Sequence, residues 1–144
     1  MILCDVNVLL YAMVAESAHH DLCRRELVAL RRRGDEIAVS ELVSAAVIRI
    51  ATNPKIFRPA AAPADAFAFV DAWSSHPRAL RITPGERHWR IFRDLVLATG
   101  LRGSDTTDAY LAALAIEHGC EWWTTDSGFA RFETLRSRNL LADP

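Results

Sequence analysis

The sequence predicts an α/β fold built on a central, mostly parallel sheet. Apolar runs of strand length recur along the chain, and segments with apolar residues at helical spacing separate them. The run that begins at Ile2 is apolar without alternation, as in a strand with both faces buried. Two such runs lead directly into carboxylates, Asp5 and Asp126. Because parallel strands end at the same edge of a sheet, we expect the ligand-binding edge to be acidic.

The predicted elements alternate along the chain and imply right-handed crossovers. The first strand begins at residue 2, and helices are expected at residues 7–13, 19–33, 41–51, 65–75, 86–98 and 105–118. Further strands are expected at 36–40, 80–82 and 121–125, then a helical turn at 127–132 and a last strand candidate within 134–141. Local signals set several boundaries: Ser40 is a natural N-cap, Gly34 is a helix stop, and Pro54 prevents continuation.

The composition is that of one ordinary globular domain. The 144 residues fit the usual domain size, so we expect a single domain over residues 1–144. Apolar residues make up 51% and charged residues 24%, and no apolar run approaches the roughly 20 residues needed to cross a bilayer. A strand follows the first residue with no basic leader, so we expect a cytoplasmic protein.

Cysteine and histidine chemistry is disfavoured. Cys4, Cys23 and Cys120 are odd in number and widely spaced, which indicates buried free thiols rather than a zinc site. The five histidines are scattered, and no local signature combines one with a nucleophile. The chemistry is therefore expected from carboxylates.

The basic residues allow two interpretations. All but one of the 17 are arginine, with clusters at residues 24–25, 31–33 and 87–93, while the net charge is −1. Arginine clusters suit nucleic-acid phosphates, but they also occur on solvated helix faces. Charge alone favours solvated faces.

Five carboxylates are expected at one end of the fold, because each follows a strand or opens a helix: Asp5, Glu41, Asp105, Asp108 and Asp126. Each could separately be a helix cap or a turn residue. Together they would repel one another unless a cation held them, and oxygen-only ligation suits Mg²⁺ or Mn²⁺. Such a site can activate water against a phosphodiester, which predicts hydrolysis of a nucleic-acid backbone.

Four motifs in order resemble the PIN-domain ribonucleases of the VapC toxin type, over nearly the full chain. The motifs are Asp5-Val-Asn7, Ser40-Glu41-Leu-Val with Arg49-x-x-Thr52-Asn53-Pro54, Asp108-Ala-Tyr-Leu-Ala-Ala, and Thr124-Thr125-Asp126-x-x-Phe129. The resemblance implies a three-layer α/β/α fold, a Mg²⁺- or Mn²⁺-dependent endoribonuclease, a homodimer and a cognate antitoxin.

The resemblance also implies roles for individual residues. Asp5 and Asp108 would be metal ligands, Asp126 a third catalytic acid and Glu41 the fourth. Asn7 and Thr125 would orient the carboxylates, and activated water would attack the phosphorus of RNA in line.

One departure from the family pattern leaves alternatives open. Many members carry the helical Glu about five residues after Glu41, where this chain has Ala46. Asp105 could therefore be a substitute acid, or the protein could bind antitoxin or RNA and cleave poorly. A phospho-aspartyl enzyme or receiver domain is disfavoured because Lys55 is the one lysine and lies mid-chain.

An antitoxin segment is expected to bind as an amphipathic helix against exposed apolar positions of the helices at 19–33 and 41–51. Val43 and Val47 are the positions at which an added charge would test this. The alternative is that both side chains belong to the core.

Overall fold

The computed structural model describes residues 1–142 and places five parallel strands in one sheet. The strand order is β3-β2-β1-β4-β5, so β1 lies at the centre. The strands are β1 (Ile2–Cys4), β2 (Ile37–Val39), β3 (Ala79–Arg81), β4 (Glu121–Thr124) and β5 (Ser137–Asn139). Each pairing is parallel, which confirms the predicted sheet and its last strand.

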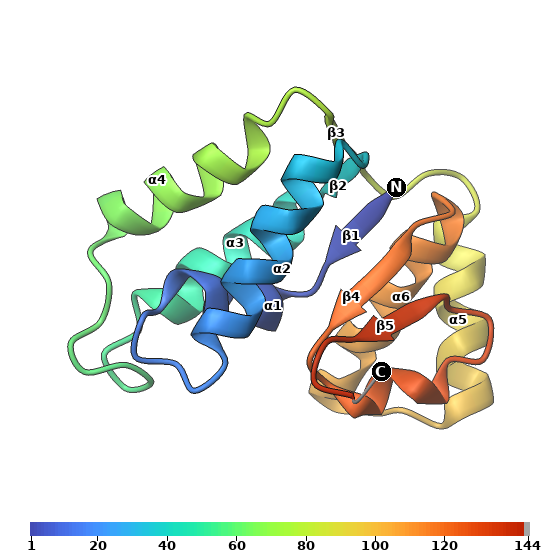
Figure 1. Cartoon of the computed structure of the whole chain (residues 1–144). Coiled ribbons are helices and arrows are strands. Elements are labelled where there is room, and N and C mark those ends of the chain that lie inside the picture. The colour runs from blue at the N-terminus through green and yellow to red at the C-terminus, as the bar shows by residue number, and fades with distance from the viewer. Residues whose placement is uncertain (143–144) are drawn as a thin grey trace.

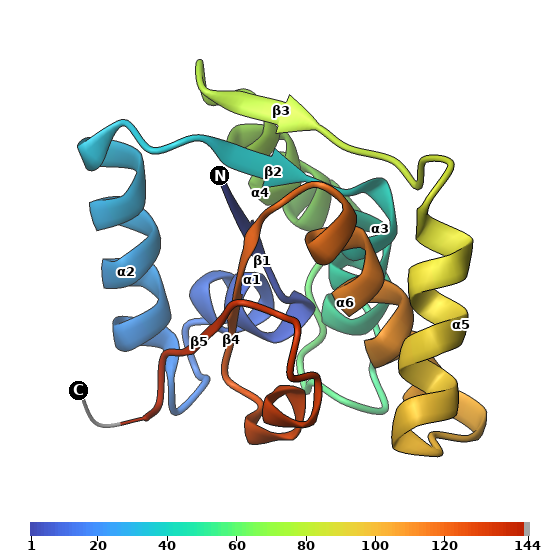
Figure 2. The same cartoon turned by 90° about the vertical axis from the view of Figure 1, so that its right-hand side faces the viewer.

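Helices cover both faces of the sheet and make three layers (Figures 1 and 2). One layer holds α1 (Val6–Met13), α2 (His20–Arg33), α3 (Glu41–Ala51) and α4 (Pro63–Ser74). The other holds α5 (His88–Thr99) and α6 (Thr106–Glu117), with the short 3-10 helices η1 (Gly103–Asp105) and η2 (Ser127–Arg131) beside α6 and β4 in sequence. The three-layer α/β/α fold is therefore confirmed. The prediction of one domain over residues 1–144 includes two residues outside the described part.

Two helices begin two residues away from their predicted starts, each for a local reason. Helix α4 begins at Pro63 rather than at residue 65, because proline suits the first turn of a helix. Helix α5 begins at His88 rather than at residue 86, since the preceding turn is tied to the end of α6. The Glu117 carboxylate accepts hydrogen bonds from the Gly85 and Arg87 amides at 2.8 and 3.0 Å.

The core lies on the central strands and on the helix faces packed against them. All residues of β1 and β2 are buried, as are Trp122 and Trp123 of β4, whereas the edge strands β3 and β5 are largely exposed. Helix α6 contributes small side chains such as Ala109 and Ala112, both fully buried. Because β1, β2 and β4 run parallel, their carboxyl ends lie at a single edge of the sheet.

Two predictions about buried residues have different outcomes. Cys4, Cys23 and Cys120 are buried free thiols, as expected, and burial raises the pKa of each. Val43 and Val47 were chosen to test antitoxin docking, with the core as the alternative, and at 2% and 0% exposed they belong to the core. Helix α3 packs on both α1 and α4, so a wider face of it is buried than its apolar spacing indicates.

No helix within residues 1–142 is both long and apolar enough to cross a membrane.

Candidate acidic site

The central strands bring Asp5 to the end of β4. Cys4 pairs with Trp123 in the parallel register, so Asp5 follows beside Thr124. The Asp5 amide donates to the Trp123 carbonyl at 2.8 Å. The Thr124 hydroxyl donates to Asp5 Oδ2 at 2.6 Å and accepts from the Asp126 amide at 3.0 Å. A continuous set of hydrogen bonds therefore joins the two strand ends that carry Asp5 and Asp126.

Asp5 is a buried carboxylate rather than a conventional helix cap. It precedes α1, but its side chain makes no capping hydrogen bond to that helix, and only 5% of the residue is exposed. The pKa of Asp5 is raised to about 6, mainly by burial and also by the charges of Asp108 and Asp126, while the hydrogen bond from Thr124 opposes the shift. The surroundings of Asp5 thus disfavour its charged form, and a bound cation would stabilise that form.

Asp108 lies in the first turn of α6 and is the second acid of the site. Desolvation raises its pKa, the Arg131 guanidinium opposes that shift, and the charges of Asp126 and Asp105 add to it. Arg131 Nη2 lies 2.5 Å from Asp108 Oδ2, with both side chains about one-third exposed. Asp108 and Asp126 therefore influence each other and Asp5, whereas Asp105 is an exposed neighbour of Asp108 alone.

Asp5 and Asp108 line the same cavity, of about 360 Å³, between α1, α3 and α6. Asn7 lies on its α1 wall, in agreement with its proposed place beside the carboxylates. The α3 wall includes Ala46 and Arg49. Ala46, the position at which the resemblance implied a glutamate, therefore lies on the wall of the acidic cavity and supplies no carboxylate there.

Glu41 takes a different position from the three aspartates. It opens α3, as predicted, but its carboxylate pairs with Arg81 at the end of β3, 2.8 Å away. The Glu41 side chain is 80% exposed and lines a neighbouring groove between α3 and α4, not the cavity of Asp5 and Asp108. Asp5 and Asp108 thus share a cavity, Asp126 lies near enough for its charge to act on both, and Glu41 lies to one side.

Two residues of the site were missed by sequence reasoning. Thr125 was expected to orient a carboxylate, but the hydrogen bond to Asp5 comes from Thr124. Only the β1–β4 register distinguishes the two threonines, since neighbouring strand residues face opposite sides. Arg131 was not singled out, and its separation of 23 residues from Asp108 offered no local signal.

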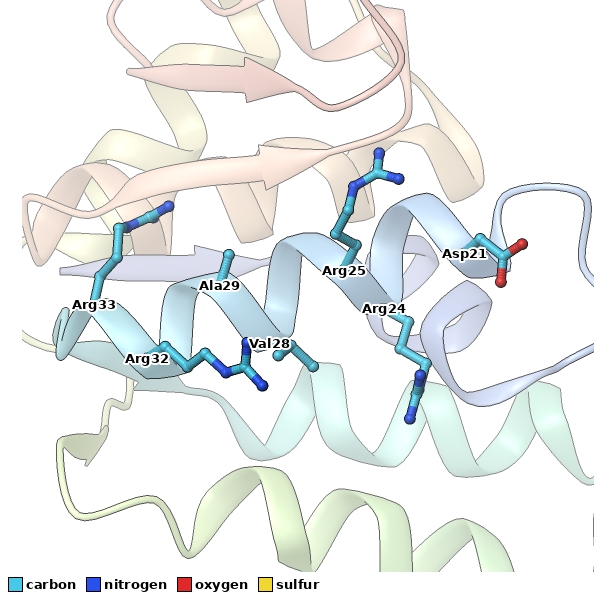
Figure 3. A pocket seen from close by; sticks show the side chains of 7 residues that line it. All are labelled: Asp21, Arg24, Arg25, Val28, Ala29, Arg32 and Arg33. Carbon is cyan, nitrogen blue, oxygen red and sulfur yellow. The ribbon is translucent and has the colours of Figure 1, made fainter.

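The arginine cluster of α2 lies outside the acidic cavity. Arg24, Arg25, Arg32 and Arg33 project from α2 around a separate cavity of about 510 Å³ (Figure 3). Asp21 lines this cavity too, and none of the predicted catalytic acids does. The cluster is thus a basic face of α2 that lies apart from the predicted catalytic acids.

A model of the PIN domain family matches residues 2–135. The chain belongs to the PIN-domain family. This PIN domain is 41% identical over 141 residues to "Ribonuclease VapC43" of Mycobacterium tuberculosis, covering 98% of this chain and 96% of that protein. It is also 39% identical over 136 residues to "Ribonuclease VapC25" of the same species, covering 94% and 96%. The relatives at this similarity are thus VapC ribonucleases of nearly equal length.

Solved structures agree with this PIN fold. A chain of the VapBC2 crystal structure from Rickettsia felis, bound to a DNA fragment from its promoter, superposes with a TM-score of 0.69. The two chains share 21% identity, with 96% of this chain and 98% of that chain covered. A chain of VapBC-1 from nontypeable Haemophilus influenzae gives a TM-score of 0.67 at 15% identity, with 99% and 100% covered. These likenesses concern the fold.

The acids of this PIN domain suit a hard divalent cation. The donors are carboxylate oxygens, and Asp5 is buried with its charge opposed by two neighbouring aspartates. Within residues 1–142, no three His, Cys, Asp or Glu side chains are arranged as one ligand group. Mg²⁺ retains several water molecules and is commonly held by one or two carboxylates, so Asp5 and Asp108, which line one cavity, are the residues that could hold it.

Proposed function

We propose that this PIN domain is a Mg²⁺- or Mn²⁺-dependent endoribonuclease, acting as the toxin of a toxin–antitoxin pair. The observation that carries the proposal is the convergence of Asp5 and Asp108 on one cavity, with Asp126 hydrogen-bonded into the same strand ends. Near full-length identity of 41% to proteins named as VapC ribonucleases supports RNA as the substrate. An enzyme acting on cellular RNA would work in the cytoplasm, as the sequence led us to expect.

Asp5 and Asp108 are the proposed metal ligands, and Asp126 the third acid. A divalent cation supplies Lewis acidity toward a phosphodiester oxygen and lowers the pKa of water. The Thr124 hydroxyl fixes Asp5 through Oδ2, which leaves Oδ1 for other contacts. Asp126 Oδ1 accepts from the Gly128 amide at 2.7 Å, so this carboxylate is oriented by its own turn. Hydrogen bonds within the fold thus orient the Asp5 and Asp126 carboxylates.

Arg49 is the proposed contact for the RNA backbone on the α3 wall. It is exposed, lines the acidic cavity and lies three residues after Ala46 on the same helix. A guanidinium matches a phosphate in a bidentate geometry. A phosphate entering this cavity would therefore meet acids on one wall and a cation on another.

A weakly cleaving PIN-like module is the second candidate, and a specific observation favours it. Ala46 occupies the cavity wall while Glu41 is paired with Arg81 outside it, so the α3 wall supplies no acid in this arrangement. Glu41, which the family resemblance implied as the fourth acid, could reach the aspartates only by leaving Arg81. In the weaker enzyme, the remaining aspartates would bind metal and RNA with slow cleavage.

The proposed protein partner is an antitoxin, because the structural neighbours come from VapBC complexes. The exposed apolar Val28 of α2 lines a cavity of about 170 Å³ with Phe69 and Trp73 of α4. Because Val43 and Val47 are buried, we propose this groove between α2 and α4 as the site at which the antitoxin docks. Val28→Glu should weaken antitoxin binding in a pull-down while leaving RNA cleavage intact. A homodimer remains part of the proposal.

The direct test incubates purified, antitoxin-free protein with total RNA in Mg²⁺, in Mn²⁺ and in EDTA, with Asp5→Asn in parallel. The proposal expects discrete fragments with either metal and none in EDTA or with the variant. Sequencing the fragment ends would identify the substrate. Intact RNA in both metals would instead support the binding module.

A further inference from the structure

The ion pair between Arg131 and Asp108 has a consequence for the acidic site. Asp108 is proposed to bind a divalent cation, yet the same carboxylate already binds a guanidinium at 2.5 Å. Two cations on one carboxylate repel each other across a partly desolvated site. Metal binding and the Arg131 contact must therefore compete.

Arg131 is held at this position by the surrounding fold. It is the last residue of η2, whose first turn is fixed by the hydrogen bond from the Gly128 amide to Asp126. Its guanidinium lies 5.2 Å from the ring centroid of the buried Phe132. Arg131 is therefore attached to the turn that carries the third acid and is directed toward the second.

The pair is less exposed than most other ion pairs within residues 1–142. The Arg131 and Asp108 side chains are 33% and 30% exposed, against 70% and 80% for Arg81 and Glu41. The Arg131 side chain still has access to solvent, so it can move without unfolding η2. An arginine released there would be free beside the cavity into which an RNA phosphate would enter.

We propose that Arg131 is a resident counter-ion that changes partner during the reaction cycle. Without metal it binds Asp108; when a divalent cation binds Asp108, Arg131 is released and donates to a phosphate of the RNA. The inference rests on the proposed function, and it deepens it by assigning a substrate-positioning residue that also sets the metal affinity. No proton or covalent bond changes in the exchange.

The test is calorimetric titration of Mn²⁺ into the wild-type protein and into Arg131→Met. Methionine keeps a long apolar stem over Phe132 and removes the charge. Because a competing cation is lost, Arg131→Met should bind Mn²⁺ about 5-fold more tightly, the effect of a pair at the strong end of the exposed range. Arg131→Lys, which retains the charge, should stay within about 2-fold of the wild-type protein.

A second titration measures the other half of the exchange. A labelled 12-nucleotide RNA of mixed sequence is added in Ca²⁺, with fluorescence anisotropy as the readout. Arg131→Met should bind this RNA about 10-fold more weakly, the effect of losing one charge-assisted hydrogen bond. The two affinities should therefore change in opposite directions, which a loss of folding cannot produce.

Arg78→Met is the matched control, because Arg78 pairs loosely with Glu36 just before the strands begin, at the opposite edge of the sheet. It should alter neither affinity by more than about 2-fold. Equal or weaker Mn²⁺ binding by Arg131→Met would overturn the competition, and unchanged RNA binding would overturn the transfer to phosphate. Failure of the proposed function looks different: Mn²⁺ binding would then be absent from the wild-type protein or unaffected by Asp108→Asn.

Discussion

Asp5 and Glu41 hold similar places in the sequence and opposite places in the structure. Each follows a buried strand and precedes or begins a helix. Asp5 is 5% exposed, bound by Thr124 and surrounded by like charges, while the Glu41 side chain is 80% exposed and paired with Arg81. A carboxylate at a strand end is therefore not enough to make a site.

The difference follows from the neighbours of the two strands. Strand β1 has β4 on one side, so Asp5 meets Thr124 and Asp126, and α6 adds Asp108 to the same cavity. Strand β2 has β3 on its outer side, and β3 ends at Arg81, which neutralises Glu41. Negative charge gathers at the end of the central strand β1. At the end of β2, nearer the edge of the sheet, the charge of Glu41 is neutralised by Arg81.

The largest expected effect is on the rate of RNA cleavage, which should depend on Asp5 and Asp108 and not on Glu41. Asp5→Asn and Asp108→Asn should each lower the RNA cleavage rate about 100- to 1000-fold, as when one group of a preorganised electrostatic site is removed. Initial rates at saturating Mg²⁺ measure this. Retained far-ultraviolet circular dichroism would show that folding is intact, and activity within 10-fold of the wild-type rate would remove these residues from the active site.

The second effect concerns the pH dependence of stability. The pKa of Asp5 is about 6 in the folded protein against an ordinary 3.8, so the folded state binds the proton more tightly. The contribution of Asp5 to the free energy of unfolding is then fully present below about pH 4. It is lost as the pH rises through about 6, which lowers the free energy of unfolding by roughly 2 to 3 kcal/mol without metal. Asp5→Asn should match the wild-type protein at pH 4 and exceed it at pH 8.

Urea unfolding at both pH values in EDTA measures the difference. If Asp5→Asn were destabilised equally at pH 4 and pH 8, the charge of Asp5 would not reduce the free energy of unfolding.

The third effect tests the hydrogen bonds that distinguish the Asp5 region. Thr124→Val keeps the shape of the side chain but removes both the donor to Asp5 and the acceptor for the Asp126 amide. We expect a loss of about 1 to 2 kcal/mol in the free energy of unfolding. Thr124→Ser retains the hydroxyl and should recover most of it. Thr125→Val is the neighbouring control, and an equal loss there would contradict the assignment.

The smallest effect is expected at Glu41. Because both partners of its ion pair are exposed, Glu41→Gln should change the free energy of unfolding by less than about 1 kcal/mol. Its cleavage rate should stay within about 3-fold of the wild-type rate, a factor that corresponds to less than 1 kcal/mol. A 10-fold loss of cleavage would mean that Glu41 leaves Arg81 and joins the aspartates when RNA binds.

The sequence predicted the order of the elements because periodicity and local boundary signals are encoded within short segments. The apolar run of β1, the stop at Gly34 and the helix start after Ser40 are of this kind, although the Ser40 side chain makes no capping hydrogen bond. Asp5 and Asp126 could be placed at one edge because parallel strands share a direction. Local patterns were therefore sufficient for the fold and for the general position of the acids.

Contacts that depend on register or on distant partners could not be predicted. A shift of one residue exchanges Thr124 for Thr125, and no pattern in the sequence fixes that shift. Arg131 reaches Asp108, and Arg81 reaches Glu41, across 23 and 40 residues. The pairing of these two acids with arginine is thus a tertiary property, which no local pattern in the sequence indicates.

The most direct test of the central claim is a Mn²⁺ titration of four proteins: the wild type, Asp5→Asn, Asp108→Asn and Glu41→Gln. If the cation site belongs to the β1–α6 region, both aspartate variants lose at least about 10-fold in affinity, as is seen even for weaker perturbations of metal sites, and Glu41→Gln binds like the wild type. Equal losses in Glu41→Gln and Asp5→Asn would contradict the account, because the metal would then be held across both strand ends.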